Sequence, residues 1–326
     1  MLSMKPRLRA DLMLASVTMI WGINFSVMKD AYTCFDPLAF TTLRFIVAVI
    51  ALYVVLRWRG ISLQVDRRDL PALIGFGVLS NTVYQVLFVI GLAGTRAGNA
   101  GLLMASSPVF AYLTGVVLKR ETFRRRVLVG ILLSMAGVSA VIAFGPRGIS
   151  LGQASRGDIL ILLSAVCWGC YTGAAARLIL KYGALRLTFW VMLTGTAGML
   201  LFLAPFLLGQ NWAAITVRCW SGFLYSALLA IVFGYITWTY ALQHLGVART
   251  AVYSNVTPIL ALLAGWMLLG EQPVAAQLAG VVMILGGVYF VRTRRGAWLA
   301  LRKGAWIRTW VAPHKPQPSP QDGDAL

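Results

Sequence analysis

Long apolar stretches separated by short charged segments form the main pattern of this chain. About 20 mostly apolar residues cross the hydrocarbon core of a membrane as an α-helix, and a helix satisfies its own backbone polar groups in lipid. Each long stretch therefore predicts a membrane-spanning helix, although the second reaches that length only by including Arg44. The predicted spans cover residues 12–28, 45–56, 70–95, 97–118, 127–146, 159–176, 187–217, 219–243, 250–270 and 272–291.

Composition places the chain in the same class. Of its 326 residues, 59% are hydrophobic and only 12% are charged, whereas roughly 25% of the residues in a soluble domain are charged. We therefore expect an all-α integral membrane protein with ten transmembrane helices.

The basic residues alternate between the two ends of the predicted helices. Alternate connections and the two termini carry 23 of the 29 Lys and Arg residues, the opposite connections carry five, and Arg44 lies within a helix. By the positive-inside rule, this distribution predicts that both termini are cytoplasmic, as in a cell inner-membrane protein. A nucleic-acid-binding surface would instead gather its basic residues on one face. Membrane lipid, and not nucleic acid, is the expected partner of these charges, including those of the tail with its tryptophans.

The chain also contains an internal repeat with an offset of 150 residues. Five residues of the first half return at this offset in the second half: Pro108, Gly115, Glu121, Gly130 and Gly137 return as Pro258, Gly265, Glu271, Gly280 and Gly287. Because each half holds five helices, an odd number, the second half enters the membrane from the opposite side. Inverted repeats of this kind build carriers whose substrate site lies between the halves.

These boundaries predict five segments. We expect a cytoplasmic N-terminus at 1–11, a first repeat at 12–146, a linker at 147–157, a second repeat at 158–292 and a basic cytoplasmic tail at 293–326. Glycines in the fifth helix of each half predict close helix packing. We expect that packing within one chain, with a homodimer contact as the alternative.

Motifs at matching places in both halves resemble those of the EamA-type branch of the drug/metabolite transporter superfamily. They are Trp21-Gly22-Ile23-Asn24-Phe25, Leu43-Arg44-Phe45, Ser107-Pro108-Val109-Phe110, Gly115 through Leu118 to Glu121, Thr257-Pro258-Ile259 and Leu268-Leu269-Gly270-Glu271. The resemblance covers residues 12 to about 292. It implies a ten-helix inner-membrane carrier, commonly an exporter of amino acids or other small metabolites, and it names no particular substrate.

Polar and aromatic residues at helical spacing identify faces that could enclose a substrate chamber, because such side chains are costly against lipid. One stripe runs through Asn81, Tyr84, Gln85 and Phe88, at the i, i+3, i+4 and i+7 positions of a helix face. Ordinary helix packing is the alternative for all of them. The predicted substrate-binding residues are Trp21, Asn24, Arg44, Asn81, Tyr84, Gln85, Tyr171, Tyr235, Trp238 and Tyr253.

Arg44 and two prolines carry separate predictions. Arg44 is expected to extend its side chain toward the interface. The alternative is that it attracts an anionic group or pairs with Asp30 or Asp36 at the outer mouth. Pro108 and Pro258 lie inside predicted helices, where proline removes a backbone hydrogen bond. We expect a kink at each, acting either as a hinge of alternating access or as a static packing feature.

Other chemistry has little support in the sequence. Cys167 and Cys170 have CxxC spacing but lack further ligands for zinc, so we read them as small apolar residues. Glu121 and Glu271 lie just beyond predicted spans and are expected to anchor helix ends. No GxxxxGK[ST] phosphate loop occurs, and no cofactor or metal is expected. The rival classes are a membrane-embedded enzyme, which would need clustered catalytic side chains, and a scaffold or lipid-handling protein, which would need no polar stripes.

Overall fold

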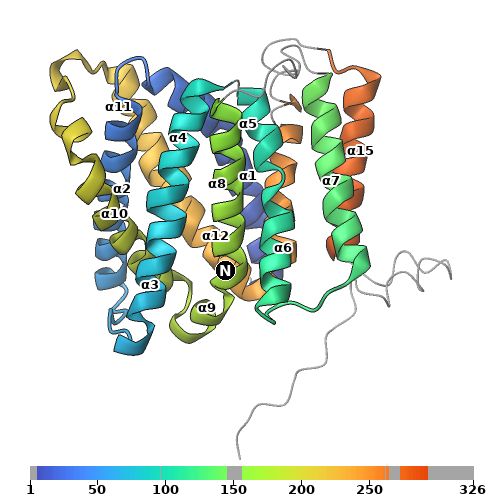
Figure 1. Ribbon diagram of the computed structural model, residues 1–326, viewed down its shortest axis with the longest axis horizontal. Coiled ribbons are helices and arrows are strands. Elements are labelled where there is room, and N and C mark those ends of the chain that lie inside the picture. The colour runs from blue at the N-terminus through green and yellow to red at the C-terminus, as the bar shows by residue number, and fades with distance from the viewer. Residues whose placement is uncertain (1–5, 96, 145–155, 261, 264–271, 293–326) are drawn as a thin grey trace, which may run out of the picture. The chain divides into compact units, whose positions relative to one another are not determined.

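The described residues of this computed structural model are 6–95, 97–144, 156–260, 262–263 and 272–292. The described residues up to Val291 form one compact unit. Within the first unit the structure is helical, and its main helices run side by side (Figure 1). In chain order they are α1 (Pro6–Ala31), α2 (Pro37–Trp58), α3 (Leu70–Gly77), α4 (Tyr84–Gly94), α5 (Ala97–Met104), α6 (Ser107–Val117), α7 (Arg125–Ala143), α8 (Arg156–Ala174), α9 (Ala176–Tyr182), α10 (Ala184–Leu208), α11 (Val217–Leu224), α12 (Gly234–Leu245), α13 (Val247–Val252) and α15 (Ala275–Arg292).

Short 3₁₀ and π-helical segments lie between some of these α-helices. Three are 3₁₀ turns, namely η1 (Arg67–Asp69), η3 (Trp212–Ala214) and η5 (Tyr253–Val256). Two are π-helical: η2 (Val78–Val83) joins α3 to α4, and η4 (Tyr225–Phe233) joins α11 to α12.

Nine helical segments in the part of the chain that the structure describes are long and apolar enough to cross a membrane. They correspond in order to nine of the ten predicted spans. The remaining prediction, residues 250–270, falls partly on residues 261 and 264–270, which lie outside the described ranges. The second span is longer than predicted, because α2 runs from Pro37 to Trp58 and includes Arg44.

Helix ends are fixed by local capping. The Asp36 carboxylate accepts hydrogen bonds from the backbone N–H groups of Leu38 and Ala39, which have no partner inside α2,. Gly246 has a φ of 85° where α12 ends and α13 begins, a conformation that favours glycine. Glu121 accepts a hydrogen bond from the Val247 N–H at 3.0 Å. Glu121 therefore anchors a helix end, as predicted, whereas Glu271 lies outside the described residues.

Helices α7 and α15 pack through glycines. We call Gly130 and Gly137 of α7, together with Gly280 and Gly287 of α15, the glycine seam. A Cβ atom added at Gly137 would lie 2.5 Å from the Gly280 carbonyl oxygen, and one added at Gly280 would lie 2.7 Å from the Gly137 oxygen. The two helices stand next to each other in Figure 1. These glycines are in backbone contact within one chain, so the predicted intramolecular packing is confirmed for these four residues.

Candidate functional site

A cavity of about 120 Å³ lies among the central helices. That is roughly ten times the space that one water molecule needs, so it admits a small organic molecule. Residues on both sides of the predicted linker line it. The lining residues are Trp21, Asn24, Met28, Arg44, Tyr84, Gln85, Phe88, Gly101, Met104, Ala105, Ser107, Trp168, Ala230, Ile231, Tyr235, Ser254, Thr257 and Pro258.

Trp168 on α8 is the centre of an aromatic cluster at this cavity. Its ring centroid lies 6.1 Å from that of Trp21, 5.2 Å from that of Tyr84 and 5.3 Å from that of Tyr235. Trp21 is fixed in turn by a hydrogen bond from its Nε1 to the Ala230 carbonyl oxygen at 2.8 Å. The cavity wall is thus largely aromatic and apolar, and it suits a substrate with an apolar body.

Arg44 is the charged residue of the lining. Only 1% of Arg44 is exposed, so its side chain does not extend to an interface. Its Nη1 donates to the Ser226 hydroxyl at 2.9 Å, and its Nη2 donates to Gln85 Oε1 at 2.8 Å. The expected extension toward the interface is therefore wrong, because α10, α4 and η4 pack around this part of α2.

Of the alternatives for Arg44, the pairing with Asp30 or Asp36 does not form. Asp30 forms a bidentate ion pair with Arg218 instead, with hydrogen bonds of 2.9 and 2.6 Å. Asp36 caps α2. Both carboxylates thus have other partners near the helix ends, and the partners of Arg44 among the described residues are neutral.

Gln85 connects the two sides of the cavity. Its Oε1 accepts from Arg44, and its Nε2 donates to the Tyr235 hydroxyl at 3.2 Å. Gln85 and Tyr235 are 150 residues apart, the offset of the internal repeat. Corresponding positions of the third and eighth predicted spans therefore meet at the cavity.

Four predicted site residues lie outside this lining. Tyr171 and Trp238 are 1% and 2% exposed and pack behind Trp168, with ring centroids 5.6 and 5.5 Å from it. The Tyr253 hydroxyl donates to the Asp11 carboxylate at 2.7 Å. Asn81 is fully buried and donates to the Val191 carbonyl oxygen of α10 at 2.9 Å. Asn81 thus contributes to helix packing.

The π-helical segment η2 explains why Asn81 departs from the predicted stripe. In a π-helix each N–H bonds the carbonyl five residues earlier, as the Tyr84 N–H does to Leu79. The wider turn changes the angle between Asn81 and Gln85, so one faces α10 and the other faces the cavity. The segment η4 ends at Phe233, 150 residues after the end of η2 at Val83. Each π-helical segment therefore ends just before a cavity residue, η2 before Tyr84 and η4 before Tyr235, while Ala230 and Ile231 line the cavity from within η4.

The two hinge predictions coincide with helix breaks. Helix α5 ends at Met104 and α6 begins at Ser107, which places Pro108 in the first turn of α6. A first-turn proline lacks an N–H that would have no helical partner there. Pro258 follows the 3₁₀ segment η5 in the same way and lines the cavity. Each break precedes its proline, where a kink at the proline was expected.

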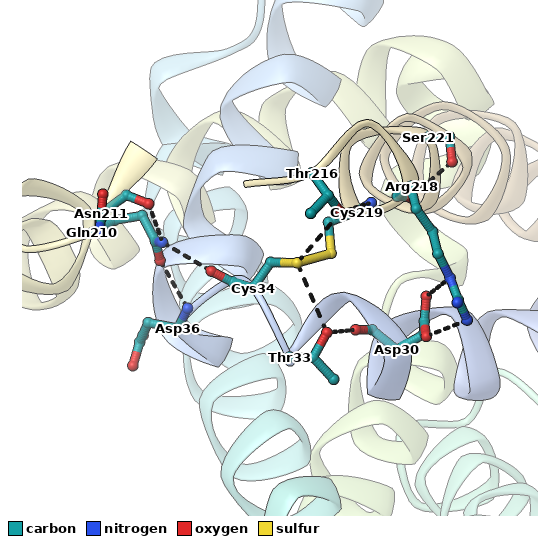
Figure 2. The surroundings of a disulfide bond; sticks show 10 residues. All are labelled: Asp30, Thr33, Cys34, Asp36, Gln210, Asn211, Thr216, Arg218, Cys219 and Ser221. Carbon is teal, nitrogen blue, oxygen red and sulfur yellow. Dashed lines mark hydrogen bonds and ion pairs between the residues drawn. A yellow bond between two sulfur atoms is a disulfide. The ribbon is translucent and has the colours of Figure 1, made fainter. Parts of the chain in front are cut away.

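Cys34 and Cys219 form a disulfide that was not predicted from the sequence. It joins the α1–α2 connection to α11, and Figure 2 shows the contacts around it. The Asp30–Arg218 ion pair lies on one side, and on the other Gln210 donates to the Cys34 carbonyl oxygen and accepts from the Asp36 N–H. We call this the disulfide end of the helices. The available signal was that Cys34 lies between the first two predicted spans and Cys219 begins the eighth, which the predicted topology places on the same side of the membrane.

Comparison with known proteins agrees with this architecture. A crystal structure of another protein superposes with a TM-score of 0.73, at 19% sequence identity, over 91% of this chain and 99% of that one. An uncharacterized transporter of Archaeoglobus fulgidus is 27% identical over 88% of this chain and 98% of its own length. A probable amino-acid metabolite efflux pump of Salmonella typhimurium is 29% identical over 86% of this chain and 95% of its own.

The family profile gives the identification. The profile of the EamA-like transporter family matches two stretches of this chain, residues 8–143 and 155–293. Together these stretches contain every residue that lines the cavity and all of the apolar helices except the first two residues of α1. The chain therefore belongs to the EamA-like transporter family, as a multi-pass membrane protein that transports small molecules and is not an enzyme.

Proposed function

We propose that this protein exports amino acids or related small metabolites across the cell inner membrane by alternating access. The cavity is the observation that carries the proposal. Both profile-matched stretches line it, the first with Trp21, Arg44 and Gln85 and the second with Trp168 and Tyr235. A site held between two halves opens to one side or the other as the halves rock against each other.

The relatives support the substrate class. The efflux pump of Salmonella typhimurium that this chain resembles is named for amino-acid metabolites. The aromatic walls of the cavity suit an apolar side chain, and its few polar groups suit the charged end of a small metabolite,.

Two independent features support cytoplasmic termini. The excess of Lys and Arg lies in connections such as 57–68 and 119–126, at the opposite end of the helices from the disulfide. Disulfides persist outside the cytoplasm, where the environment is oxidising. Charge and disulfide thus agree on an outward-facing disulfide end. In this orientation the two halves are inverted with respect to each other.

Transport itself is tested with purified protein in sealed liposomes. Vesicles loaded with each of the twenty proteinogenic amino acids should release at least one of them faster than protein-free vesicles. Gln85→Ala and Tyr235→Ala should slow that release, because both remove groups that line the cavity. Tyr53→Ala is the matched control, since Tyr53 is 45% exposed on the outside of α2. Absence of release across a broad metabolite panel would refute the proposal.

Orientation is tested through the cysteines. Cys219→Ser leaves Cys34, which is partly exposed, as a free thiol. A membrane-impermeant maleimide added to intact cells should label this variant and leave the wild-type Cys34 unlabelled. Labelling that requires cell lysis would place the disulfide end in the cytoplasm and reverse the assigned direction.

A further inference from the structure

Arg44 is a buried cation whose hydrogen-bond acceptors among the described residues are all neutral. Ser226 and Gln85 each accept one hydrogen bond from its guanidinium, and its Nη1 also approaches the Met28 sulfur at 3.3 Å. The buried Nε atom has no hydrogen-bond partner in the part of the chain that the structure describes. The guanidinium thus lines the cavity with donor capacity unused, and Arg presents its donors in a planar fork that fits a carboxylate.

None of the carboxylates within the described ranges forms an ion pair with Arg44. Asp30 pairs with Arg218, Asp66 and Asp69 pair with Lys181, and Asp36 caps α2. Phe40 and Phe45 present ring faces 5.5 and 5.9 Å from the guanidinium carbon. Such faces attract a cation, but this attraction is weaker than the cost of burying an unpaired charge.

Asn24 offers the complementary group in the same cavity. Its Oδ1 atom is buried and has no hydrogen-bond donor, while its Nδ2 contacts the Met28 sulfur at 3.1 Å. An unpartnered carbonyl oxygen accepts from an ammonium or another N–H group. The cavity therefore presents an unused cationic donor on α2 and an unused acceptor on α1, and the rings of Trp21, Tyr84 and Trp168 line the same cavity.

We infer that Arg44 binds a free carboxylate of the transported molecule, which displaces Gln85 from the guanidinium, while Asn24 accepts a hydrogen bond from a donor group such as its ammonium. The substrate is then the counter-ion that the described residues do not supply. The inference rests on the proposed function and deepens it. It requires a free carboxylate on the substrate and an apolar remainder against the aromatic walls.

The first experiment compares each amino acid with its carboxamide in the reconstituted vesicles. A carboxamide has nearly the same shape but carries no negative charge for Arg44. We expect the transported amino acids to move at least tenfold faster than their carboxamides, since one charge-assisted hydrogen bond contributes a factor of roughly ten or more. Equal rates for acid and carboxamide would overturn the inference and leave the transport function intact. No movement of any amino acid or other metabolite would refute the transport function itself.

Two variants locate the effect at Arg44. Arg44→Gln should raise the half-saturation concentration for the amino acid roughly tenfold or more and should remove the preference over the carboxamide. Arg218→Gln is the matched control, because its side chain is 78% exposed at the disulfide end and its loss should leave both rates unchanged. Arg44→Lys should restore part of the preference, since lysine keeps the charge and loses the fork.

Gln85→Glu keeps the inference testable if Arg44→Gln does not fold. It places a carboxylate beside Arg44, where Gln85 Oε1 now lies at 2.8 Å, and supplies the missing counter-ion internally. We expect this variant to fold at least as stably as the wild type in a thermal melt. Its amino-acid transport should fall tenfold or more, because the guanidinium is already paired. A stable Gln85→Glu protein with wild-type amino-acid transport would show that Arg44 does not bind the carboxylate.

Discussion

The glycine seam and the cavity treat the duplicated sequence in opposite ways. In the seam, Gly130 and Gly137 match Gly280 and Gly287 at the 150-residue offset, and backbone touches backbone. At the cavity, Gln85 meets its own counterpart, Tyr235, and the two side chains differ in size and chemistry. The difference follows from what each place requires. A backbone contact admits only glycine in both copies, whereas a binding site for an asymmetric molecule needs unlike groups on its two sides.

The largest effect is expected where the two copies agree most closely. A Cβ added at Gly287 would meet the Gly130 carbonyl oxygen and lie 2.6 Å from the Ser134 nitrogen. Gly287→Ala should therefore lower the free energy of unfolding by about 3 kcal/mol, at the upper end of overpacking costs. The neighbouring Gly286→Ala is the control, because its Cβ would meet only the Leu133 side chain at 3.7 Å. Thermal melts in detergent that show equal losses for both variants would break the comparison.

Removal of the polar link at the cavity should cost less. Gln85→Leu deprives Arg44 of one acceptor and leaves the Tyr235 hydroxyl without the amide. We expect a loss of about 2 kcal/mol, the cost of one hydrogen bond to a charged group. Thermal melts in detergent and an amino-acid transport assay on the same variant should show a partial loss of the free energy of unfolding and a larger fractional loss of the transport rate. If the free energy of unfolding fell as far as in Gly287→Ala, the polar link at the cavity would stabilise the fold as much as the glycine seam does, and the comparison would fail.

Tyr235→Phe tests the contribution of the hydrogen bond between Gln85 and Tyr235 alone. It removes the hydroxyl that accepts from Gln85 Nε2 at 3.2 Å and keeps the ring against Trp168. One neutral hydrogen bond contributes about 1 kcal/mol, so the loss should be half that of Gln85→Leu. Transport should change little, because Arg44 and the aromatic wall of the cavity are unchanged. Chemical denaturation and flux on the same preparation test both statements, and a larger effect here than at Gln85 would reverse the asymmetry.

The smallest effect is expected at a solvent-exposed ion pair between the two halves. Lys181 pairs with Asp66 and Asp69 at 3.4 and 2.5 Å, and its side chain is 47% exposed. The hydrogen bond to Asp69, then that to Tyr182, raises the pKa of Lys181. A raised lysine pKa means that the stabilisation is complete below the ordinary lysine range and is lost only above it. Lys181→Ala should leave the melting temperature unchanged within error from pH 5 to 9. A pH-dependent difference in that range would contradict this.

Sequence periodicity predicted the spans and much of the cavity, because apolar length and helical spacing act locally. Trp21, Asn24, Arg44, Tyr84, Gln85 and Tyr235 all line the cavity. Asn81 shows where the periodicity fails, since a π-helical turn lies inside the span and no residue type marks it. The burial of Arg44 was equally hidden, because it depends on how α10, α4 and η4 pack around α2. Residue identity gives the cost of burying a charge, and only the fold shows that the charge is buried.

The Cys34–Cys219 disulfide also has a consequence for the synthesis of the protein. The two cysteines are 185 residues apart, so the first emerges from the ribosome long before the second. In the proposed orientation the bond can close only after the segment that carries Cys219 has reached the outer side of the membrane. Non-reducing electrophoresis of pulse-labelled chains would then date the insertion of the second half. The disulfide-bonded form would contain only those molecules in which both halves have been inserted into the membrane and have come into contact.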